Sequence, residues 1–192
     1  MILLYDIFLF MKKFSIILAV DNKNWIWKNN DLAWKINADM KYFKETTTKT
    51  KDLWKHNAVI MWRKTWESIP TKYKPLPDRV NCVISSTLKQ ESSNSKIDDF
   101  VLYYKSLDNA LEELEKKDNI ENIFIIWWAM IYNQALKHPN LDKIYLTEID
   151  WDFDCDTFVV LDLEDFQVES KWTIHEENNL RYRFMIYSKQ KN

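Results

Sequence analysis

The amino-acid sequence predicts an α/β fold: a single domain with a central, mostly parallel twisted sheet flanked by helices and a C-terminal antiparallel hairpin. Short apolar runs rich in β-branched residues alternate with segments that carry apolar residues at helical spacing, which is typical of parallel sheets. The 192 residues suit one domain with a full core, and no internal repeat, low-complexity segment or linker divides them. In the last two expected strands, apolar and polar residues alternate, which is typical of the two arms of an antiparallel hairpin.

The first half of the chain supplies three expected strands and two expected helices. Each expected strand is a buried apolar run, and the first is bounded by a polar cluster at Asn22–Asn24. The strands are Phe14–Asp21, Asn57–Met61 and Arg79–Ser85, the helices are Ala38–Thr46 and Lys64–Ile69, the latter ended by Pro70, and Lys28–Asp31 is an expected loop.

The second half begins with a polar connection at Gln90–Asp99 and ends in the hairpin. Ser106 is a good N-cap for a helix with Leu107, Ala110, Leu111 and Leu114 on one face. Further expected elements are the strands Ile123–Ile126 and Lys143–Ile149, a helix at Met130–Lys137, and the arms Phe166–Ser170 and Arg181–Ser188, in which Tyr182, Phe184 and Ile186 alternate with Arg181, Arg183 and Met185.

Bulk composition restricts the class of partner. A net charge of −2 and a pI near 6.0 argue against nucleic acid or an anionic membrane as partner. Cys82 and Cys155 lack metal-ligand spacing, so we expect buried free thiols in a reducing compartment and no metal site. The apolar run 1–10 is too short to span a bilayer and lacks the features of a signal peptide. We interpret it as an extension, or as residues upstream of a true start at Met11, before a domain at 11–192, in a cytoplasmic monomer.

The chain contains no glycine and ten tryptophans. Average usage predicts roughly 13 glycines in a chain of this length. Glycine supplies positive φ and close backbone approach, and tryptophan is its bulkiest substitute. We interpret Trp25, Trp27, Trp62, Trp127 and Trp128 as glycine positions of a gene in which UGA encodes glycine and has been read as tryptophan. A deliberately glycine-free sequence is the alternative. Trp34 and Trp66 are taken as genuine, and Trp172 is left open.

Asp39 is the candidate catalytic carboxylate. It lies in a predicted helix beside the apolar Met40 and Phe43. Such a carboxylate can hold a flat, amino-substituted heterocycle through two parallel charge-assisted hydrogen bonds. From the pattern alone, the helix macrodipole is the better explanation of an acid in a first helical turn.

A second candidate site follows the strand that ends at Met61. Arg63, Lys64 and Thr65 begin a short helix there, and free backbone N–H groups with two cations favour phosphate. A solvated basic turn is the alternative for this tripeptide. No G-x-G-x-x-G fingerprint is present.

With glycine at 62, 127 and 128, five segments resemble the dihydrofolate reductase family in order and spacing, over about Phe14–Ser188. They are Asn30–Lys44 (NDLAWKINADMKYFK), Val59–Ile69 (VIMWRKTWESI) with Pro75–Arg79 (PLPDR), Ile123–Tyr132 (IFIIWWAMIY), Tyr145–Asp150 (YLTEID) and Asp154–Phe158 (DCDTF). The resemblance implies NADPH-dependent reduction of 7,8-dihydrofolate to 5,6,7,8-tetrahydrofolate, with hydride delivered to C6 and a proton to N5, in support of one-carbon and thymidylate metabolism.

The resemblance also implies roles for single residues toward the substrate. Asp39 would anchor the pterin and promote its protonation, and Trp34 would flank the pterin and order a water near Asp39. Arg79 would pair with the α-carboxylate of the glutamate tail, assisted by Lys74, and Thr147 would support Asp39 through a hydrogen bond. The remaining walls of the pterin and benzoyl pockets would be Ile17, Met40, Phe43, Ile69 and Ile126.

Toward NADPH, the resemblance implies that Lys64 and Thr65 contact the pyrophosphate and that Arg63 and Ser86 contact the 2′-phosphate. The backbone of Ala19 and Ile26 would meet the nicotinamide carboxamide. Read literally, Trp127 and Trp128 would fill the pyrophosphate site. The other residues implied to bind the cofactor are Trp25, Trp27, Ser85, Ala129, Met130, Ile131 and Tyr132.

Some positions depart from the family pattern, and two rival functions stay open. Ala33 and Asn37 replace prolines often found around Trp34, and Val159-Val160 replaces a Phe-Pro. One rival is a pyrimidine reductase of riboflavin synthesis, which would share the fold and NADPH. The other is a catalytically inert nucleotide-binding protein, which literal tryptophans at 127 and 128 would favour.

Overall fold

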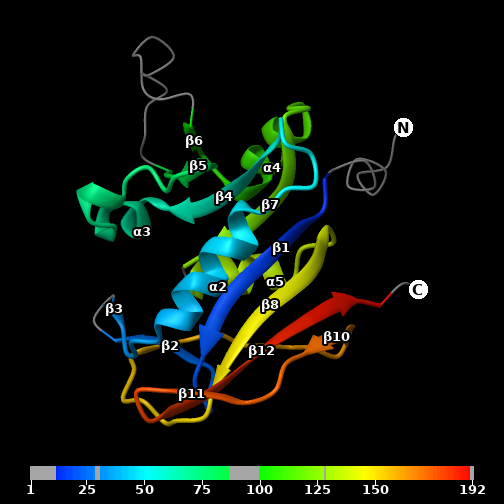
Figure 1. The fold of residues 1–192 in the computed structure, drawn as a ribbon. Helices are drawn as coiled ribbons and strands as arrows, with labels where there is room; N and C mark the ends of the chain where they lie inside the picture. The colour runs from blue at the N-terminus through cyan, green and yellow to red at the C-terminus, as the bar shows by residue number, and fades with distance from the viewer. Residues whose placement is uncertain (1–11, 29–30, 87–99, 128, 191–192) are drawn as a thin grey trace.

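A computed structural model of the chain describes residues 12–28, 31–86, 100–127 and 129–190. The predicted extension at 1–10 and the predicted polar connection at 90–99 lie outside the described residues. Figure 1 shows a twisted sheet with helices packed against it. In the described part of the chain, no helix is long and apolar enough to cross a membrane.

The elements are named here by their bounds. The strands are β1 Phe14–Val20, β2 Trp25–Lys28, β3 Asp31–Leu32, β4 His56–Trp62, β5 Arg79–Ile84, β6 Val101–Tyr104, β7 Ile120–Ile126, β8 Leu141–Ile149, β9 Thr157–Phe158, β10 Phe166–Lys171, β11 His175–Glu177 and β12 Leu180–Lys189. The helices are α2 Asn37–Thr48, α3 Arg63–Ser68, α4 Leu107–Glu115 and α5 Ala129–Leu136, with a one-turn 3-10 helix η1 at Thr71–Tyr73.

The main sheet has the strand order β10-β12-β8-β1-β7-β4-β5-β6, and β11 pairs with β12. The six strands from β8 to β6 run parallel, whereas β12 is antiparallel to β8 and β10 is antiparallel to β12. The predicted α/β fold, with a mostly parallel sheet and an antiparallel C-terminal end, is confirmed. Strand β6 (VLYY) was missed by the sequence analysis, although it is a short apolar run; its residues are half-buried or exposed because β6 is the edge strand of the sheet.

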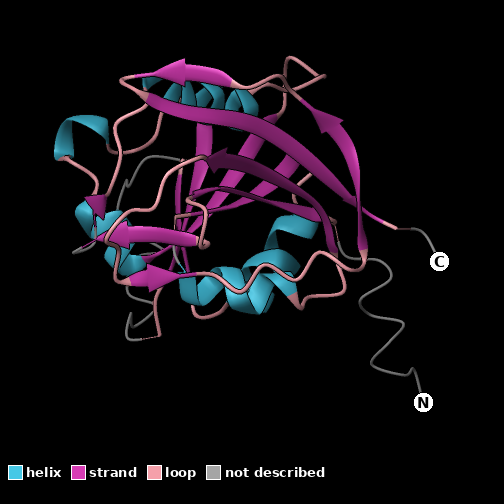
Figure 2. Ribbon diagram, turned by 90° about the horizontal axis from the view of Figure 1, so that it is seen from below, coloured by secondary structure: helices cyan, strands magenta, loops and turns pink. Residues whose placement is uncertain are grey.

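The two faces of the sheet pack against different helices, because successive side chains of a strand point to opposite sides. Ile16 and Ile125 belong to the cluster that contains the apolar residues of α4 and α5. Ile17 and Ile126 belong to the cluster that contains Phe43 of α2. Figure 2 shows helices on both sides of the strands. The alternation therefore places α2 on one side of β1 and α5 on the other.

Helix α4 forms as its capping residue predicts. The Ser106 hydroxyl accepts a hydrogen bond from the backbone N–H of Asn109 at 3.1 Å. Its predicted apolar face, Leu107, Ala110, Leu111 and Leu114, is buried.

The expected loop at Lys28–Asp31 is corrected by a small second sheet. Strands β3, β2 and β9 pair in that order, with Lys28 opposite Asp31. These strands are two to four residues long, and backbone pairing rather than an apolar pattern defines them. Residues 29–30 between them lie outside the described residues.

The C-terminal arms pair as predicted, but the tight hairpin is formed by β11 and β12. The turn between them uses Asn178 and Asn179, which have φ of 53° and 60°. Asparagine tolerates this left-handed region, so a two-residue turn of type I′ geometry forms without glycine. The expected alternation in β12 is wrong at Met185, which is 3% exposed because it packs into the apolar cluster that contains Ile144 and Leu146 of β8.

Candidate active site

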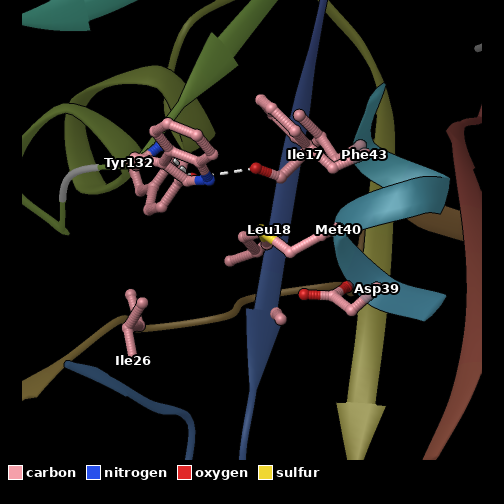
Figure 3. Close-up of a pocket in the computed structure, with 9 residues that line it drawn as sticks. Ile17, Leu18, Ile26, Asp39, Met40, Phe43 and Tyr132 are labelled. Atoms are coloured by element: carbon pink, nitrogen blue, oxygen red, sulfur yellow. Dashed lines mark hydrogen bonds between the residues drawn. The ribbon is translucent and has the colours of Figure 1, made fainter. Parts of the chain in front are cut away.

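A small pocket lies beside the C-terminal half of β1, where α2, β2 and the junction between β7 and α5 meet (Figure 3). Its volume of about 20 Å³ leaves room for about one water molecule. Of the lining residues, only Leu18 was missed by the sequence analysis, and it lies between two predicted ones on β1. The lining residues are Ile17, Leu18, Ala19, Ile26, Asp39, Met40, Phe43, Trp127 and Tyr132.

Asp39 provides the carboxylate of this pocket, from the first turn of α2. The side chain is 6% exposed, and the Thr147 hydroxyl on β8 donates a hydrogen bond to its Oδ1 at 2.7 Å. Burial raises the pKa of Asp39 to about 6, although the Thr147 hydrogen bond lowers it in part. Asp39 can therefore gain and lose a proton close to neutral pH, as a general acid or base requires.

Replacing Thr147 by valine is expected to raise the pKa of Asp39 further, above about 6. The hydroxyl stabilises the ionised carboxylate, so its loss leaves burial unopposed and favours the protonated form. The measurement is a ¹³C NMR titration of the Asp39 carboxyl, with the Asp39→Asn protein used to assign the resonance. Thr48→Val is the control, because the Thr48 hydroxyl donates to the Lys44 carbonyl on the exposed side of the same helix. An unchanged or lowered pKa in Thr147→Val would contradict this assignment.

The helix that carries Asp39 is capped from a distant part of the chain. Ile36, at its N-cap, makes no side-chain capping bond. Instead, the Glu177 carboxylate on β11 accepts the backbone N–H groups of Asn37 at 2.7 Å and Ala38 at 3.1 Å. These bonds hold the pKa of Glu177 below its ordinary value. A carboxylate is a favourable partner for the positive end of the helix dipole, so Glu177 fixes the start of α2.

Tyr132 ties the β7–α5 junction to β1 across the pocket. Its hydroxyl accepts the backbone N–H of Trp127 at 2.6 Å and donates to the Ile17 carbonyl at 2.8 Å. The Thr65 hydroxyl donates to the Trp127 carbonyl at 2.7 Å. Both backbone groups of residue 127 are therefore held by buried side chains, which fixes its position at the pocket wall.

The backbone at Trp127 has a conformation that suits glycine. Its φ is 50°, and the other described residues with positive φ are Asn24, Asp78, Asn178 and Asn179. Asparagine and aspartate tolerate this region, whereas a bulky side chain is strained there. No other described tryptophan has a positive φ, and Trp62 adopts an ordinary φ of −79°. Among the described tryptophans, the backbone conformation therefore supports glycine at position 127 and not at the others.

The Trp127 side chain lies on the ring of Phe43. The two ring centroids are 4.5 Å apart with an interplanar angle of 26°. The apolar indole thus stacks on an aromatic ring in the same pocket as Asp39, and the expectation that a literal Trp127 fills the pyrophosphate site stays a prediction. The indole thereby takes up space that a flat ligand stacked on Phe43 would need.

Arg79 is a buried cation with neutral hydrogen-bond partners. It is 3% exposed, and its guanidinium donates to the Thr47 hydroxyl at 2.7 Å and to the Pro77 carbonyl at 3.0 Å. Burial lowers its pKa to about 10. No carboxylate in the described part of the chain forms an ion pair with it. A buried guanidinium of this kind favours an anionic partner, and a carboxylate matches its bidentate geometry.

The predicted phosphate-binding residues follow the ends of two neighbouring strands. Trp62 of β4 pairs with Ile84 of β5 in parallel register, so 63–65 and 85–86 emerge at the same edge of the sheet. Ligands of open parallel sheets bind at this edge. Thr65 and Ser85 are buried, whereas Arg63 and Lys64 are exposed, and Arg63 lies 3.6 Å from the Glu67 carboxylate. None of these residues, nor the exposed Ser86, lines the pocket.

Trp34 lies outside the pocket, in the cluster formed by Ile36, Ile149, Tyr182 and Phe184. It is 5% exposed, and its indole N–H has no hydrogen-bond partner within the described residues. Buried donors are nearly always satisfied, so this N–H is available to a water or a ligand oxygen.

The remaining predicted residues divide into three groups. Ile69 and Ile126 are buried in the cluster with Phe43 but do not line the pocket. The Lys74 ammonium donates to the Glu67 carbonyl at 3.1 Å and lies over the Trp66 ring. Trp25 is half-buried, and its ring contacts that of Phe158. Trp128 and the side chains of Trp27, Ala129, Met130 and Ile131 lie outside the described residues.

Three residues around the site were not predicted: Thr47, Asp21 and Glu177. Thr47 is the buried partner of Arg79, and Glu177 caps α2. Asp21 is buried directly after β1. Only Asp21 offered a signal, because an acid directly after a buried apolar strand is unusual. The described residues contain no group of three or more His, Cys, Asp or Glu that could hold a metal ion.

Comparisons with known proteins agree with this geometry. The family model described as dihydrofolate reductase matches residues 13–189. A dihydrofolate reductase of Heliothis virescens is 38% identical over 182 residues, which cover 92% of this chain and 97% of that protein. One of Drosophila melanogaster is 37% identical over 184 residues, covering 93% of this chain and 99% of that protein. A bifunctional dihydrofolate reductase-thymidylate synthase of Arabidopsis thaliana is 37% identical over 94% of this chain and 35% of its own length. The chain belongs to the dihydrofolate reductase family.

Proposed function

We propose that the chain is an oxidoreductase that reduces 7,8-dihydrofolate to 5,6,7,8-tetrahydrofolate with NADPH. The observation that carries this proposal is the buried Asp39 carboxyl, which faces an apolar pocket and has a pKa raised to about 6. Apolar walls with a single carboxyl group favour a flat heterocycle that must be protonated. Family membership supports dihydrofolate as the substrate. The matching family and relatives do not favour the pyrimidine reductase alternative.

Asp39 would bind the pterin and supply its proton. The Thr147 hydroxyl donates a hydrogen bond to Oδ1 of Asp39, so Oδ2 remains to hold the proton and to hydrogen-bond the ligand. The low exposure of Asp39 excludes bulk water, which strengthens these bonds. Arg79 would hold the anionic end of the substrate, because it is a buried cation that forms no ion pair among the described residues. NADPH, when bound, supplies the hydride.

The volume of the pocket beside Asp39 determines whether a pterin ring and a nicotinamide ring can bind there. Ligand pockets usually have volumes of about 300–1,000 Å³. With the Trp127 indole stacked on Phe43, the cavity of about 20 Å³ does not fit a pterin or a nicotinamide ring. We therefore propose that the working protein carries glycine at 127 and 128, which agrees with the φ of 50° at residue 127. The literal chain would be an inert member of the family.

The first test is the chemical identity of these residues in the protein from its native source. A peptide mass map is expected to find glycine at 25, 27, 62, 127 and 128, and the same protein is expected to oxidise NADPH only when dihydrofolate is added. The riboflavin-pathway pyrimidine serves as the control substrate and is expected to give no turnover. Tryptophan at 127 and 128 together with no turnover would decide for the inert alternative. Glycine at these positions without turnover would overturn the assigned reaction.

We also propose that the protein acts as a cytoplasmic monomer. A net charge of −2 gives it no broad electrostatic attraction to nucleic acid or anionic lipid, which supports a small-molecule substrate. Sedimentation of the purified protein measures its association state.

A further inference from the structure

Asp21 is a buried carboxylate at the end of β1, and it binds two separate loops. It is 2% exposed. Its Oδ1 accepts the backbone N–H groups of Lys23 at 2.8 Å and Trp25 at 2.9 Å, and its Oδ2 accepts the backbone N–H of Phe153 at 3.0 Å. A buried carboxylate that accepts three N–H groups is well satisfied, so it holds all three donors in place.

The two loops lie on either side of the candidate site. Loop 21–25 leads into β2, in which Ile26 is 3% exposed and lines the pocket. The segment 150–153 follows β8, the strand that carries Thr147. Asp21 therefore connects the wall formed by Ile26 to the strand that positions Asp39 through Thr147.

Three other contacts link the same loops, and all three are weaker candidates for holding them together. The exposed Asn22 side-chain amide donates to the Asp150 carboxylate at 3.3 Å. The backbone N–H of Asn22 donates to the Trp151 carbonyl at 3.1 Å. Lys23 forms an ion pair with Asp152, but the two side chains are 62% and 55% exposed. Exposed ion pairs contribute little to stability, whereas removing one partner of a buried charged hydrogen bond is costly. Asp21 is thus the principal side-chain link between the loops.

We infer that Asp21 is a positioning residue that clamps loop 21–25 to segment 150–153 and thereby sets the place of Ile26 in the pocket. The clamp between the two backbone segments does not depend on what the protein binds. Its effect on ligand binding rests on the proposed function, because Ile26 would border the nicotinamide.

Asp21→Asn separates the two halves of the clamp. The remaining amide oxygen can still accept the N–H groups of Lys23 and Trp25, but the new NH₂ group would face the Phe153 N–H, donor against donor. We expect amide hydrogen exchange at Phe153 to accelerate about tenfold or more, with a smaller change at Trp25. Asp21→Ala is expected to accelerate exchange at both positions.

Asp152→Asn is the matched control, because it makes the same chemical change in the same pair of loops at an exposed site. Its exchange rates at Phe153 and Trp25 are expected to equal those of the parent protein. If Asp21→Asn left exchange at Phe153 unchanged, or if Asp152→Asn accelerated it equally, the clamp would be refuted. Asp21→Asn keeps this test decisive even if Asp21→Ala fails to fold.

The positioning role has a second readout in the Trp127→Gly/Trp128→Gly protein. There, Asp21→Asn is expected to raise the dissociation constant for NADPH about tenfold while the pH midpoint set by Asp39 stays unchanged. Faster exchange with an unchanged dissociation constant would overturn the role at the pocket. If the parent variant binds no NADPH, the proposed function fails, and the exchange measurements on the unmodified chain still decide whether the clamp exists.

Discussion

The Trp127→Gly/Trp128→Gly protein is expected to bind dihydrofolate about 10³-fold more tightly than the tryptophan-containing chain. A ligand that stacks on Phe43 must first displace the indole, which lies 4.5 Å from that ring. Removing a large aromatic side chain from its packed site costs about 3–5 kcal/mol. A penalty of about 4 kcal/mol corresponds to about 10³-fold in affinity. Titration calorimetry with dihydrofolate on both proteins measures the difference.

The control for this substitution is Trp54→Gly. Trp54 is 62% exposed and lies in the turn between α2 and β4, away from the pocket-lining residues. Its loss is expected to leave the affinity for dihydrofolate unchanged. Equal affinities in the Trp127→Gly/Trp128→Gly protein and the parent would show that the indole does not obstruct the site.

The Trp127→Gly/Trp128→Gly protein that also carries Asp39→Asn is expected to lose about 10²- to 10⁴-fold in turnover at pH 7, the usual contribution of a positioned general acid. The asparagine amide keeps the shape of the side chain but cannot supply a proton. The loss is expected to shrink at acidic pH, where the solvent protonates the pterin directly. Turnover measured as a function of pH would show a midpoint near the Asp39 pKa of about 6 in the parent and no such midpoint in the variant. An unchanged pH–rate profile would remove Asp39 from this role.

Asp39→Asn is also expected to stabilise the fold at neutral pH. The folded-state pKa of Asp39 is raised from its ordinary 3.8 to about 6, so its contribution to stability is full below pH 3.8 and is lost as pH rises through about 6. At pH 7 the buried charge costs about 3 kcal/mol, which Asp39→Asn removes. Denaturant unfolding at pH 7 and at pH 4 measures this, with a gain expected at pH 7 alone. Glu45→Gln, on an exposed position of the same helix, is the control for both Asp39 experiments and is expected to change neither turnover nor stability.

The fold and the family could be predicted from the sequence, because the apolar runs and the order of the motifs extend over nearly the whole chain. Strand β1 is a nearly continuous apolar run, and β4 and β7 end in one, since these parallel strands are covered on both faces. Ser106 predicted its helix because a capping hydroxyl acts on its own chain neighbours. The grouping of Ile17, Asp39, Phe43 and Tyr132 around one pocket followed from matching motifs to a family rather than from local propensity.

Contacts that join distant segments through single backbone groups could not be predicted. The pairs Glu177 with Asn37 and Asp21 with Phe153 are more than a hundred residues apart, and nothing in the local sequence of either partner indicates the other. The place of the Trp127 indole also depends on tertiary packing, because a positive φ and a nearby Phe43 ring decide it together. Strands β2, β3 and β9 are too short for any periodicity to reveal them.

The cap on α2 has a consequence for how the protein matures during translation. Glu177 and the neighbouring Asn178, which donates to the Lys35 carbonyl at 2.9 Å, follow α2 by more than a hundred residues and are synthesised long after it. Strand β12, which pairs with β8 beside Thr147, is made later still. A nascent chain can therefore assemble the parallel strands before its β11–β12 hairpin has been made, but the start of α2 is secured only once Glu177 has emerged. The start of the helix that carries Asp39 is therefore fixed late, so a chain truncated before Glu177 has its parallel strands but an uncapped α2.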